Sequence, residues 1–309
     1  MYDIHRLRIL LEIHERGSLA AASRTLHLTS SAISQQMTAL EKEAGAPLIR
    51  RSGRSVRLTD EGLILVHGAR AILREMDKTA TRIAQFSGEP LGTVRLAIFQ
   101  SAAMALLPTA LSYLEQNAPQ LILEVVQIDP ETGLELTRSR QFDLAITESY
   151  PHHFVPEHED LHLELLTADP IHLVLAQDSP YTTLTEAKSL PWVFEREHNT
   201  SRIWGINQCR QAGFEPYVRY SIEDLLTHVR LAEQGYAAAI LPGFVTSSTH
   251  HKTSIKLICL PEHPERQIFT ASRIDSAGQP NIAMVRRALS YAADALKHHQ
   301  ESMCPSDSI

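Results

Sequence analysis

Four polar residues near the N-terminus have the types and spacing that could read the edges of DNA bases. They are Ser31, Gln35, Thr38 and Lys42, and Ser34 lies on their flank. Their intervals of four, three and four residues place them on one face of a helix. Hydroxyl and amide groups make the hydrogen bonds that readout in the major groove requires. The alternative is an ordinary amphipathic helix whose polar face is only solvated.

The segment around these residues has the pattern of a helix, a turn and a second helix. The apolar residues of the second helix have the spacing of an inward-facing stripe and are Ile33, Met37 and Leu40. A shorter helix precedes it, with Ser18 as its N-cap and a break over residues 27–29. A helix over residues 4–16, ended by Gly17, comes before both.

A run of arginines follows this pair of helices. Arg50, Arg51, Arg54 and Arg57 surround Gly53, a pattern that predicts a basic β-hairpin with the glycine at its tip. Such side chains can reach DNA phosphates or an adjacent minor groove. Residues 58–62 then begin a new, capped helix.

Many of these residues resemble the winged helix-turn-helix of LysR-type transcriptional regulators over residues 7–62. The matching residues are Gly17-Ser18-Leu19, Ala21-Ala22, Ala32-Ile33-Ser34-Gln35-Gln36, Leu40-Glu41, Gly45, Pro47-Leu48, Arg51 and Leu58-Thr59-Asp60-Glu61-Gly62. The resemblance implies sequence-specific binding to promoter DNA. The residues that we expect to contact DNA are Ser18, Thr29, Ser31, Ser34, Gln35, Thr38, Lys42, Arg51 and Arg54.

Charge and apolar content agree with a protein of which only one part binds nucleic acid. The 309-residue chain has a net charge of −7, yet residues 1–62 carry nine Lys/Arg against seven Asp/Glu. The remaining residues carry 20 Lys/Arg against 29 Asp/Glu, so the basic surface is local. No apolar run reaches the length of a membrane span and no signal-peptide core is present, so we expect a cytoplasmic protein.

The helix that begins near Gly62 is predicted to extend to about Ser87. Its apolar residues recur at alternating intervals of three and four and are Val66, Ala69, Leu73, Met76, Ala80 and Ile83. This is the spacing of a coiled-coil seam, and the alternative is packing against the helix's own domain. In the resembling family this linker helix dimerises the DNA-binding domains. The resemblance further implies a homotetramer on an interrupted palindrome, with access for RNA polymerase as the regulated step.

The rest of the chain has an α/β pattern in two parts. Residues 93–147 read as βαβαβ with a parallel sheet, and residues 172–241 repeat the theme more weakly before strands at 255–260 and 268–273 and a helix at 281–298. Three motifs resemble the family's effector-binding domain, itself similar to periplasmic solute-binding proteins. They are Leu106-Leu107-Pro108, Phe142-Asp143-Leu144-Ala145-Ile146, and Leu231-Ala232-Glu233-Gln234-Gly235 with Ile240-Leu241-Pro242.

The predicted fold is therefore α/β overall. It comprises a mostly helical winged helix-turn-helix, a long linker helix and a two-lobed effector domain. The expected bounds are 1–61 for the DNA-binding domain, 62–90 for the linker, 91–300 for the effector domain and 301–309 for a tail. Lobe I comprises 91–167 and 268–300, and lobe II comprises 168–267.

Polar residues at strand ends and helix starts predict an effector site between the lobes. In α/β sheets ligands bind beyond the carboxyl ends of strands, where helix N-termini offer free backbone donors. The residues are Gln100, Ser101, Thr147, Glu148, Thr200, Ser201, Ser221 and Ile222. Each Ser or Thr could equally be a plain N-cap. If Glu148 faces the site, it favours an effector with a cationic or hydrogen-bond-donating group, and the alternative is that it points to solvent.

Catalysis and metal binding lack support in the sequence. No GxSxG, HExxH, P-loop or dinucleotide-binding glycine motif is present, and the histidines of residues 152–162 and 250–251 lack fixed ligand spacing. We expect no enzyme activity, no metal and no cofactor apart from a small-molecule effector. The alternative function is a solute receptor without a regulatory role, and the basic hairpin argues against it.

Overall fold

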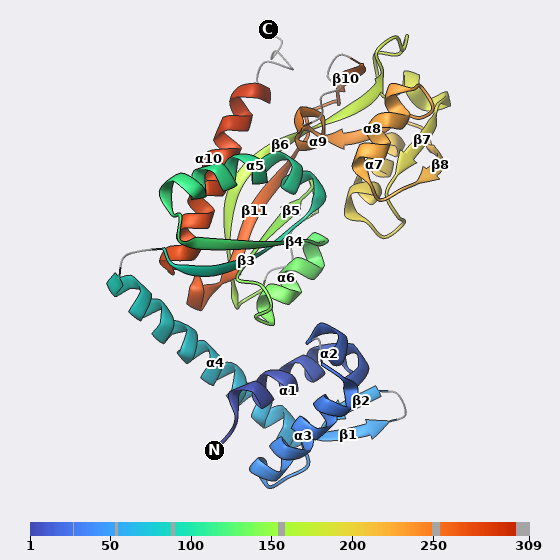
Figure 1. The fold of residues 1–309 in the computed structure, drawn as a ribbon. Coiled ribbons are helices and arrows are strands. Elements are labelled where there is room, and N and C mark those ends of the chain that lie inside the picture. The colour runs from blue at the N-terminus through green and yellow to red at the C-terminus, as the bar shows by residue number, and fades with distance from the viewer. Residues whose placement is uncertain (27, 53–54, 88–89, 154–157, 249–253, 301–309) are drawn as a thin grey trace. The chain divides into compact units, whose positions relative to one another are not determined.

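The computed structural model describes residues 1–300 except 27, 53–54, 88–89, 154–157 and 249–253. The chain forms two compact units, Met1–Ser87 and Gly88–Ile309, each of which has its own core (Figure 1). None of the described helices is both long and apolar enough to cross a membrane.

The N-terminal unit is helical apart from one hairpin. Its elements are α1 (Ile4–Arg16), α2 (Leu19–Thr25), α3 (Ser30–Ala44), β1 (Ile49–Ser52), β2 (Ser55–Leu58) and α4 (Asp60–Ser87). Each short connection is closed by a cap: Gly17 ends α1 with a φ of 65°, and the Ser18 hydroxyl accepts a hydrogen bond from the Ala21 amide. These caps fix the turn between helices that the sequence predicts.

One apolar core holds this unit together. The residues Ile33, Met37 and Leu40 of α3 are buried, as predicted, against Leu10 of α1. The first half of α4 contributes Val66 and other side chains to the same core. The orientation of α3 is therefore set by burial of its apolar stripe, which leaves the opposite face exposed.

The C-terminal unit contains a mixed sheet, and the predicted parallel βαβαβ segment is one part of it. In lobe I, β3 (Gly92–Ile98) pairs in parallel with β4 (Leu121–Gln127) and β5 (Leu144–Ser149). The returning strand β11 (Glu265–Arg273) pairs antiparallel with β5 and with β6 (Leu161–Ala176). The parallel pairing predicted for residues 93–147 is confirmed, and the antiparallel pairing of β11 with β5 and β6 is a feature that the sequence did not predict.

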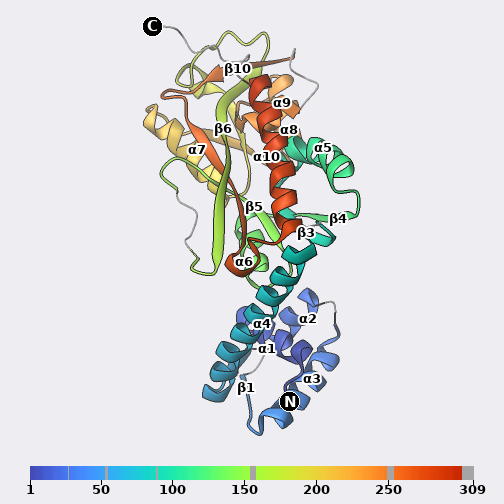
Figure 2. The same ribbon diagram turned by 90° about the vertical axis from the view of Figure 1, so that its left-hand side faces the viewer.

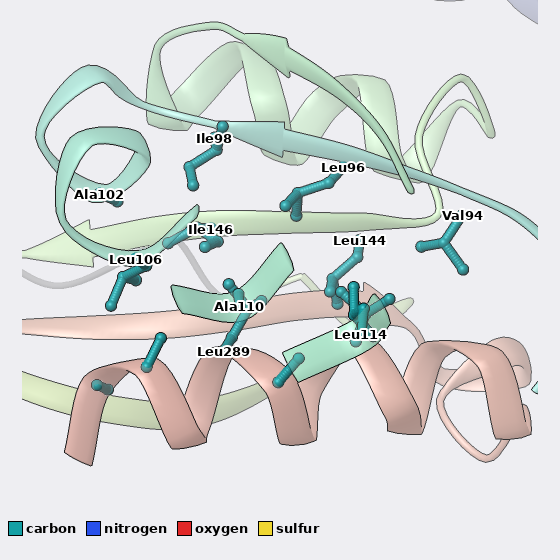
Figure 3. Packing of buried hydrophobic residues seen from close by; sticks show 14 of the residues in the cluster. Val94, Leu96, Ile98, Ala102, Leu106, Ala110, Leu114, Leu144, Ile146 and Leu289 are labelled. Atoms are coloured by element: carbon teal, nitrogen blue, oxygen red, sulfur yellow. The ribbon is translucent and has the colours of Figure 1, made fainter. Parts of the chain in front are cut away.

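Helices cover both faces of the lobe I sheet. Helices α5 (Gln100–Asn117) and α10 (Pro280–Gln300) pack on one face, where Leu96, Ile146 and Leu289 lie in one apolar layer (Figure 3). On the other face Ala97, Ala145 and Ala271 stand side by side across three strands, beneath α6 (Pro130–Arg138). These small side chains bring α6, and with it the start of that helix, close to the strand ends.

Strand β6 connects the lobes and is longer than predicted. Residues Leu161–Pro170 pair with β11, and residues Ile171–Ala176 pair with β9 (Ala239–Pro242) and β10 (Ile255–Cys259). Figure 2 shows β6 running beside β11 from one lobe toward the other. The sequence prediction begins only at residue 172, because the preceding segment contains charged residues and a proline.

Lobe II contains a pair of parallel strands, β7 (Pro191–Phe194) and β8 (Tyr217–Ser221). Helix α7 (Thr200–Gln211) packs with β7 through Trp204 and Phe194, while α8 (Leu225–Glu233) belongs to a second apolar cluster with Val193. The short helix α9 (Gly243–Ser248) follows β9. The helices of both lobes thus begin where strands end.

A substitution at Gly62 tests how closely α4 packs against the segment that leads into the hairpin. A Cβ at this position would lie 2.1 Å from the Leu48 carbonyl oxygen, which already accepts the Thr59 amide at 3.0 Å. We predict that Gly62→Ala destabilises the N-terminal unit by about 1–3 kcal/mol through overpacking. The readout is faster hydrogen exchange in peptides from residues 30–58 of the full-length protein.

Gly68→Ala is the matched control, because an added Cβ there meets nothing within 4 Å on the same helix. This change should stabilise α4 by roughly 0.5–1 kcal/mol. Equal exchange rates in the two variants would contradict the close contact at Gly62.

Candidate functional site

The outer face of α3 is polar and accessible. Ser31, Gln35, Thr38 and Lys42 are exposed, and Ser34 is half-buried. The Thr38 hydroxyl donates to the Ser34 carbonyl at 3.0 Å, which leaves the Gln35 amide as the longest neutral hydrogen-bonding group on this face. Ser18 and Thr29 instead serve as N-caps: the Thr29 hydroxyl accepts the Ala32 amide at 3.1 Å and contacts the Ser31 hydroxyl at 3.0 Å. A DNA contact by either cap stays a prediction.

The hairpin beside α3 carries adjacent positive charges. Arg50 on β1 lies opposite Arg57 on β2, and both are exposed. Like charges in this position repel one another, and a bound phosphate would remove that cost. The Arg51 side chain and all of Arg54 lie outside the described residues, so their predicted contacts stay predictions.

A cavity of about 900 Å³ lies between the lobes of the C-terminal unit. Its wall includes the starts of α5, α6, α7 and α8, together with the end of β5. Six of the eight predicted effector residues line it: Gln100, Ser101, Thr147, Glu148, Thr200 and Ser201. Strand ends and helix N-termini thus converge at one cleft, as expected for a ligand site in an α/β fold.

A buried arginine, Arg266 of β11, forms the floor of the cleft. Its guanidinium donates to Asp169 at 2.9 Å and to the Ser101 hydroxyl at 2.8 Å, and it also pairs with Glu148. The Phe99 ring stacks beneath it, 5.3 Å from the guanidinium carbon. Glu148 therefore pairs with an internal cation and does not point to solvent, and its contact with an effector stays a prediction.

A second carboxyl group, Glu195, lies on the lobe II side of the cleft. It follows β7 and accepts a hydrogen bond from the Ser201 hydroxyl. Burial, and then the charges of Glu148 and Glu223, raise the pKa of Glu195 to about 8. At neutral pH this group therefore holds its proton. The aromatic side chains of Tyr150 and Trp204 line the same cavity, with ring centroids 5.5 Å apart.

Comparison with known proteins identifies both units. Residues 4–63 match the bacterial regulatory helix-turn-helix protein, lysR family, and residues 87–294 match the LysR substrate binding domain. The chain belongs to the LysR family. Members of this family are DNA-binding transcriptional regulators with an effector-binding domain, not enzymes, and nothing supports the alternative of a solute receptor without a regulatory role.

Three proteins illustrate how far the similarity extends. The chain is 27% identical over 260 residues to the transcriptional dual regulator GltC of Bacillus subtilis, covering 82% of this chain and 85% of GltC. It is 27% identical over 307 residues to MetR of Escherichia coli, covering 96% and 92%. A full-length OxyR variant from Pseudomonas aeruginosa has the same fold, with a TM-score of 0.68 at 18% identity over 94% and 95% of the two chains.

Two predicted effector residues of this LysR-family regulator do not line the cleft. The Ser221 hydroxyl contacts Arg202 at 3.3 Å, and Ile222 packs in the apolar cluster beside α8. The physical reason is that α8 begins only at Leu225, so Ser221 and Ile222 precede its first turn. Asp224 is the N-cap and takes the position in the cleft wall that Ser221 was expected to hold.

Asp224 also joins the two lobes. The Gln100 side chain, at the start of α5, donates to the Asp224 carboxylate at 2.6 Å and accepts the Leu225 amide at 3.2 Å. One amide group therefore connects helix N-termini from opposite sides of the cleft. Sequence spacing could identify Gln100 but not its partner 124 residues away.

The predicted dimerisation seam requires a correction. Val66 and Ala69 belong to the core of the N-terminal unit, and Leu73 is only 1% exposed. The first half of α4 covers α1, where Arg70 and Glu15 lie 3.6 Å apart. Met76 and Ile83 are exposed, and the Ala80 side chain lies outside the description. Heptad spacing alone could not separate these two halves.

The histidines form no metal site in the part of the chain that the structure describes, where no group of three or more His, Cys, Asp or Glu could hold a metal ion. His250 and His251 lie outside that part.

Arg266 is expected to be essential for the stability of the C-terminal unit. Arg266→Met leaves Glu148 and Asp169 buried without their cation, which should cost about 3–5 kcal/mol. Both tryptophans of the chain, Trp192 and Trp204, are buried in lobe II, so urea unfolding followed by tryptophan fluorescence reports on this unit.

The loss should shrink as the pH falls, because protonation removes the unpaired carboxylate charges. Arg196→Met is the control: this side chain is 81% exposed, and the change should stay within about 0.5 kcal/mol. An equal effect of the two substitutions would refute the role assigned to Arg266.

Proposed function

We propose that this regulator reads an interrupted palindrome through α3, and that a small molecule in the cleft between the lobes switches its effect on transcription. The observation that carries the proposal is the exposed polar face of α3 beside the arginine pair of the hairpin. A helix with small polar side chains can enter the major groove, while arginines beside it hold the backbone. Because its target is DNA, we expect the protein to act in the cytoplasm.

Base recognition is assigned to Ser31, Ser34, Gln35 and Thr38 of α3. Gln35 is the strongest candidate, since a Gln amide can donate and accept at once on an adenine edge. Lys42, one turn past Thr38, would contact a phosphate. Arg50 and Arg57 would contribute further phosphate contacts, together with the predicted Arg51 and Arg54.

Dimerisation is assigned to the exposed apolar side chains of α4. Ile72 and Met76 are each 42% exposed, and Ile83 is 67% exposed. Their intervals of four and seven residues keep them on one face. A second copy of the helix would cover this face, and two such dimers would form the homotetramer that the family resemblance implies.

The effector would act by favouring one arrangement of the lobes. The Gln100 contact with Asp224 and Leu225 crosses the cleft, so a ligand between the lobes changes the free energy of that closed arrangement. It can alter DNA binding only if its affinity differs between the two arrangements. The resulting change in DNA geometry would alter the access of RNA polymerase to the promoter.

Gln35→Ala and Arg57→Ala separate base readout from phosphate binding. Gln35→Ala should lose about 1–3 kcal/mol on its operator and become less selective at one base position. Arg57→Ala should weaken binding to all sequences alike and reduce the dependence of log K on log salt by about one. The measurement is a mobility shift with the DNA upstream of the gene and with random DNA, at several salt concentrations.

The assignment of base readout to Gln35 fails if Gln35→Ala loses equal affinity for operator and random DNA. The proposed function itself fails if the wild-type protein binds both DNAs equally well.

A further inference from the structure

The charges that line the cleft are mainly negative. Among the described residues that line it are six carboxyl groups: Asp129, Glu131, Glu148, Glu195, Glu223 and Asp224. The same lining contains two arginines, Arg196 and Arg266. With Glu195 protonated at neutral pH, five carboxyl groups still face two arginines, an excess that attracts cations and repels anions, most strongly in a cavity partly screened from water.

Arg266 is not available to an anionic ligand, and Arg196 lies at the exposed rim. Arg266 is surrounded by Asp169, Glu148 and Ser101, which occupy its nitrogens. Arg196 pairs with Glu223 at 3.1 Å on the exposed rim. Within the cleft, a carboxylate ligand would have to break the buried ion pairs of Arg266 before it gained a positive partner there.

Glu195 differs from Glu148, which pairs with Arg266, and from Glu223, which pairs with Arg196. Its hydrogen-bonding partner is the Ser201 hydroxyl, and no described Lys, Arg or His side chain forms an ion pair with it. Nearby, Tyr150 is 4% exposed and Trp204 is 2% exposed, and both rings line the cavity. Carboxylate and aromatic rings together form a favourable site for an organic ammonium or guanidinium group.

We propose that the effector is an organic cation whose ammonium or guanidinium group binds Glu195 beside the rings of Tyr150 and Trp204. This inference rests on the cleft being the effector site. Glu195 would bind the positive group of the effector in place of Glu148, the residue predicted from the sequence, because Arg266 already pairs with Glu148. The acidic side chains Asp129 and Glu131, on the lobe I side, would receive a second positive group of a longer ligand.

Binding of such a cation should release a proton. The groups that face Glu195 are Glu148 of β5, Tyr150, Glu223 before α8, Arg266 of β11 and Ser201 of α7. Arg202 of α7 also contacts this residue, because its guanidinium donates to the Glu195 carbonyl at 2.8 Å. Burial and the two neighbouring glutamates hold the pKa of Glu195 near 8, against the influence of Arg266. Burial, and then Glu148, also raise the pKa of Tyr150 well above its usual range, so Tyr150 keeps its proton throughout.

The sign of the pH dependence follows from this proton. Below about pH 8 a cation must displace the proton of Glu195, so its affinity rises with pH by up to tenfold per unit. A ligand that accepts a hydrogen bond from protonated Glu195, such as a carboxylate, would bind more weakly as the pH rises. The direction of the change therefore separates the two ligand classes.

The test is calorimetry on the full-length protein with linear diamines of three to six carbons and dicarboxylates of matching length. We expect the diamines to bind more tightly, with a dissociation constant that falls between pH 6 and 8 and a proton released to the buffer. Glu195→Gln should abolish both the proton release and the pH dependence. Glu215→Gln, outside the cleft and paired with Arg210 at 2.7 Å, should leave both unchanged.

Preference for the dicarboxylates, binding by neither series, or a pH dependence that survives Glu195→Gln overturns the proposal. A mobility shift with the DNA upstream of the gene is measured on the same samples without ligand. If only the ligand class is wrong, the wild-type protein still shifts the DNA. If the wild-type protein does not shift the DNA, the proposed function itself is wrong.

Discussion

The buried guanidinium of Arg266 is the constraint on which the C-terminal unit depends. It lies where β6 and β11 pair, directly opposite Asp169 in the register. Asp169 also accepts the Phe244 amide of α9 at 2.9 Å. A charge taken out of water at this depth is tolerated only because carboxylates and hydroxyls from several elements surround it. The same contacts fix Ser101 at the start of α5 and Glu148 at the end of β5, and so position the floor of the cleft.

The carboxyl groups around the cleft fall into two sets, one that stabilises the fold and one that is open to a ligand. Glu148 and Asp169 compensate the charge of Arg266 and hold the C-terminal unit together, while Glu195 lines the cavity without an ion pair of its own. The Gln100 contact with Asp224 then links lobe II to the helix that the Arg266 cluster holds in lobe I. A ligand in the cleft therefore acts on groups that belong to both lobes, which is the physical requirement for a switch.

Local sequence patterns were sufficient for the helix-turn-helix of the N-terminal unit and for much of the α/β fold. The stripe of Ile33, Met37 and Leu40 predicted both the buried and the exposed faces of α3. Side-chain partners distant in sequence were not predictable. Arg266 gives no local signal among the residues of a strand, and Glu195 follows a strand as many structural carboxylates do. The coiled-coil seam predicted for α4 is wrong for the first half of the helix, because packing against α1 and packing against a second copy require the same apolar spacing.

The central claim is that two copies of α3 read a symmetric DNA site. Selection of bound sequences from random double-stranded DNA by the full-length protein tests it most directly. We expect enrichment of two inverted half-sites whose centres are separated by about 10–10.5 base pairs or a multiple of that distance. Enrichment of a single unpaired site, or of no sequence at all, would contradict it.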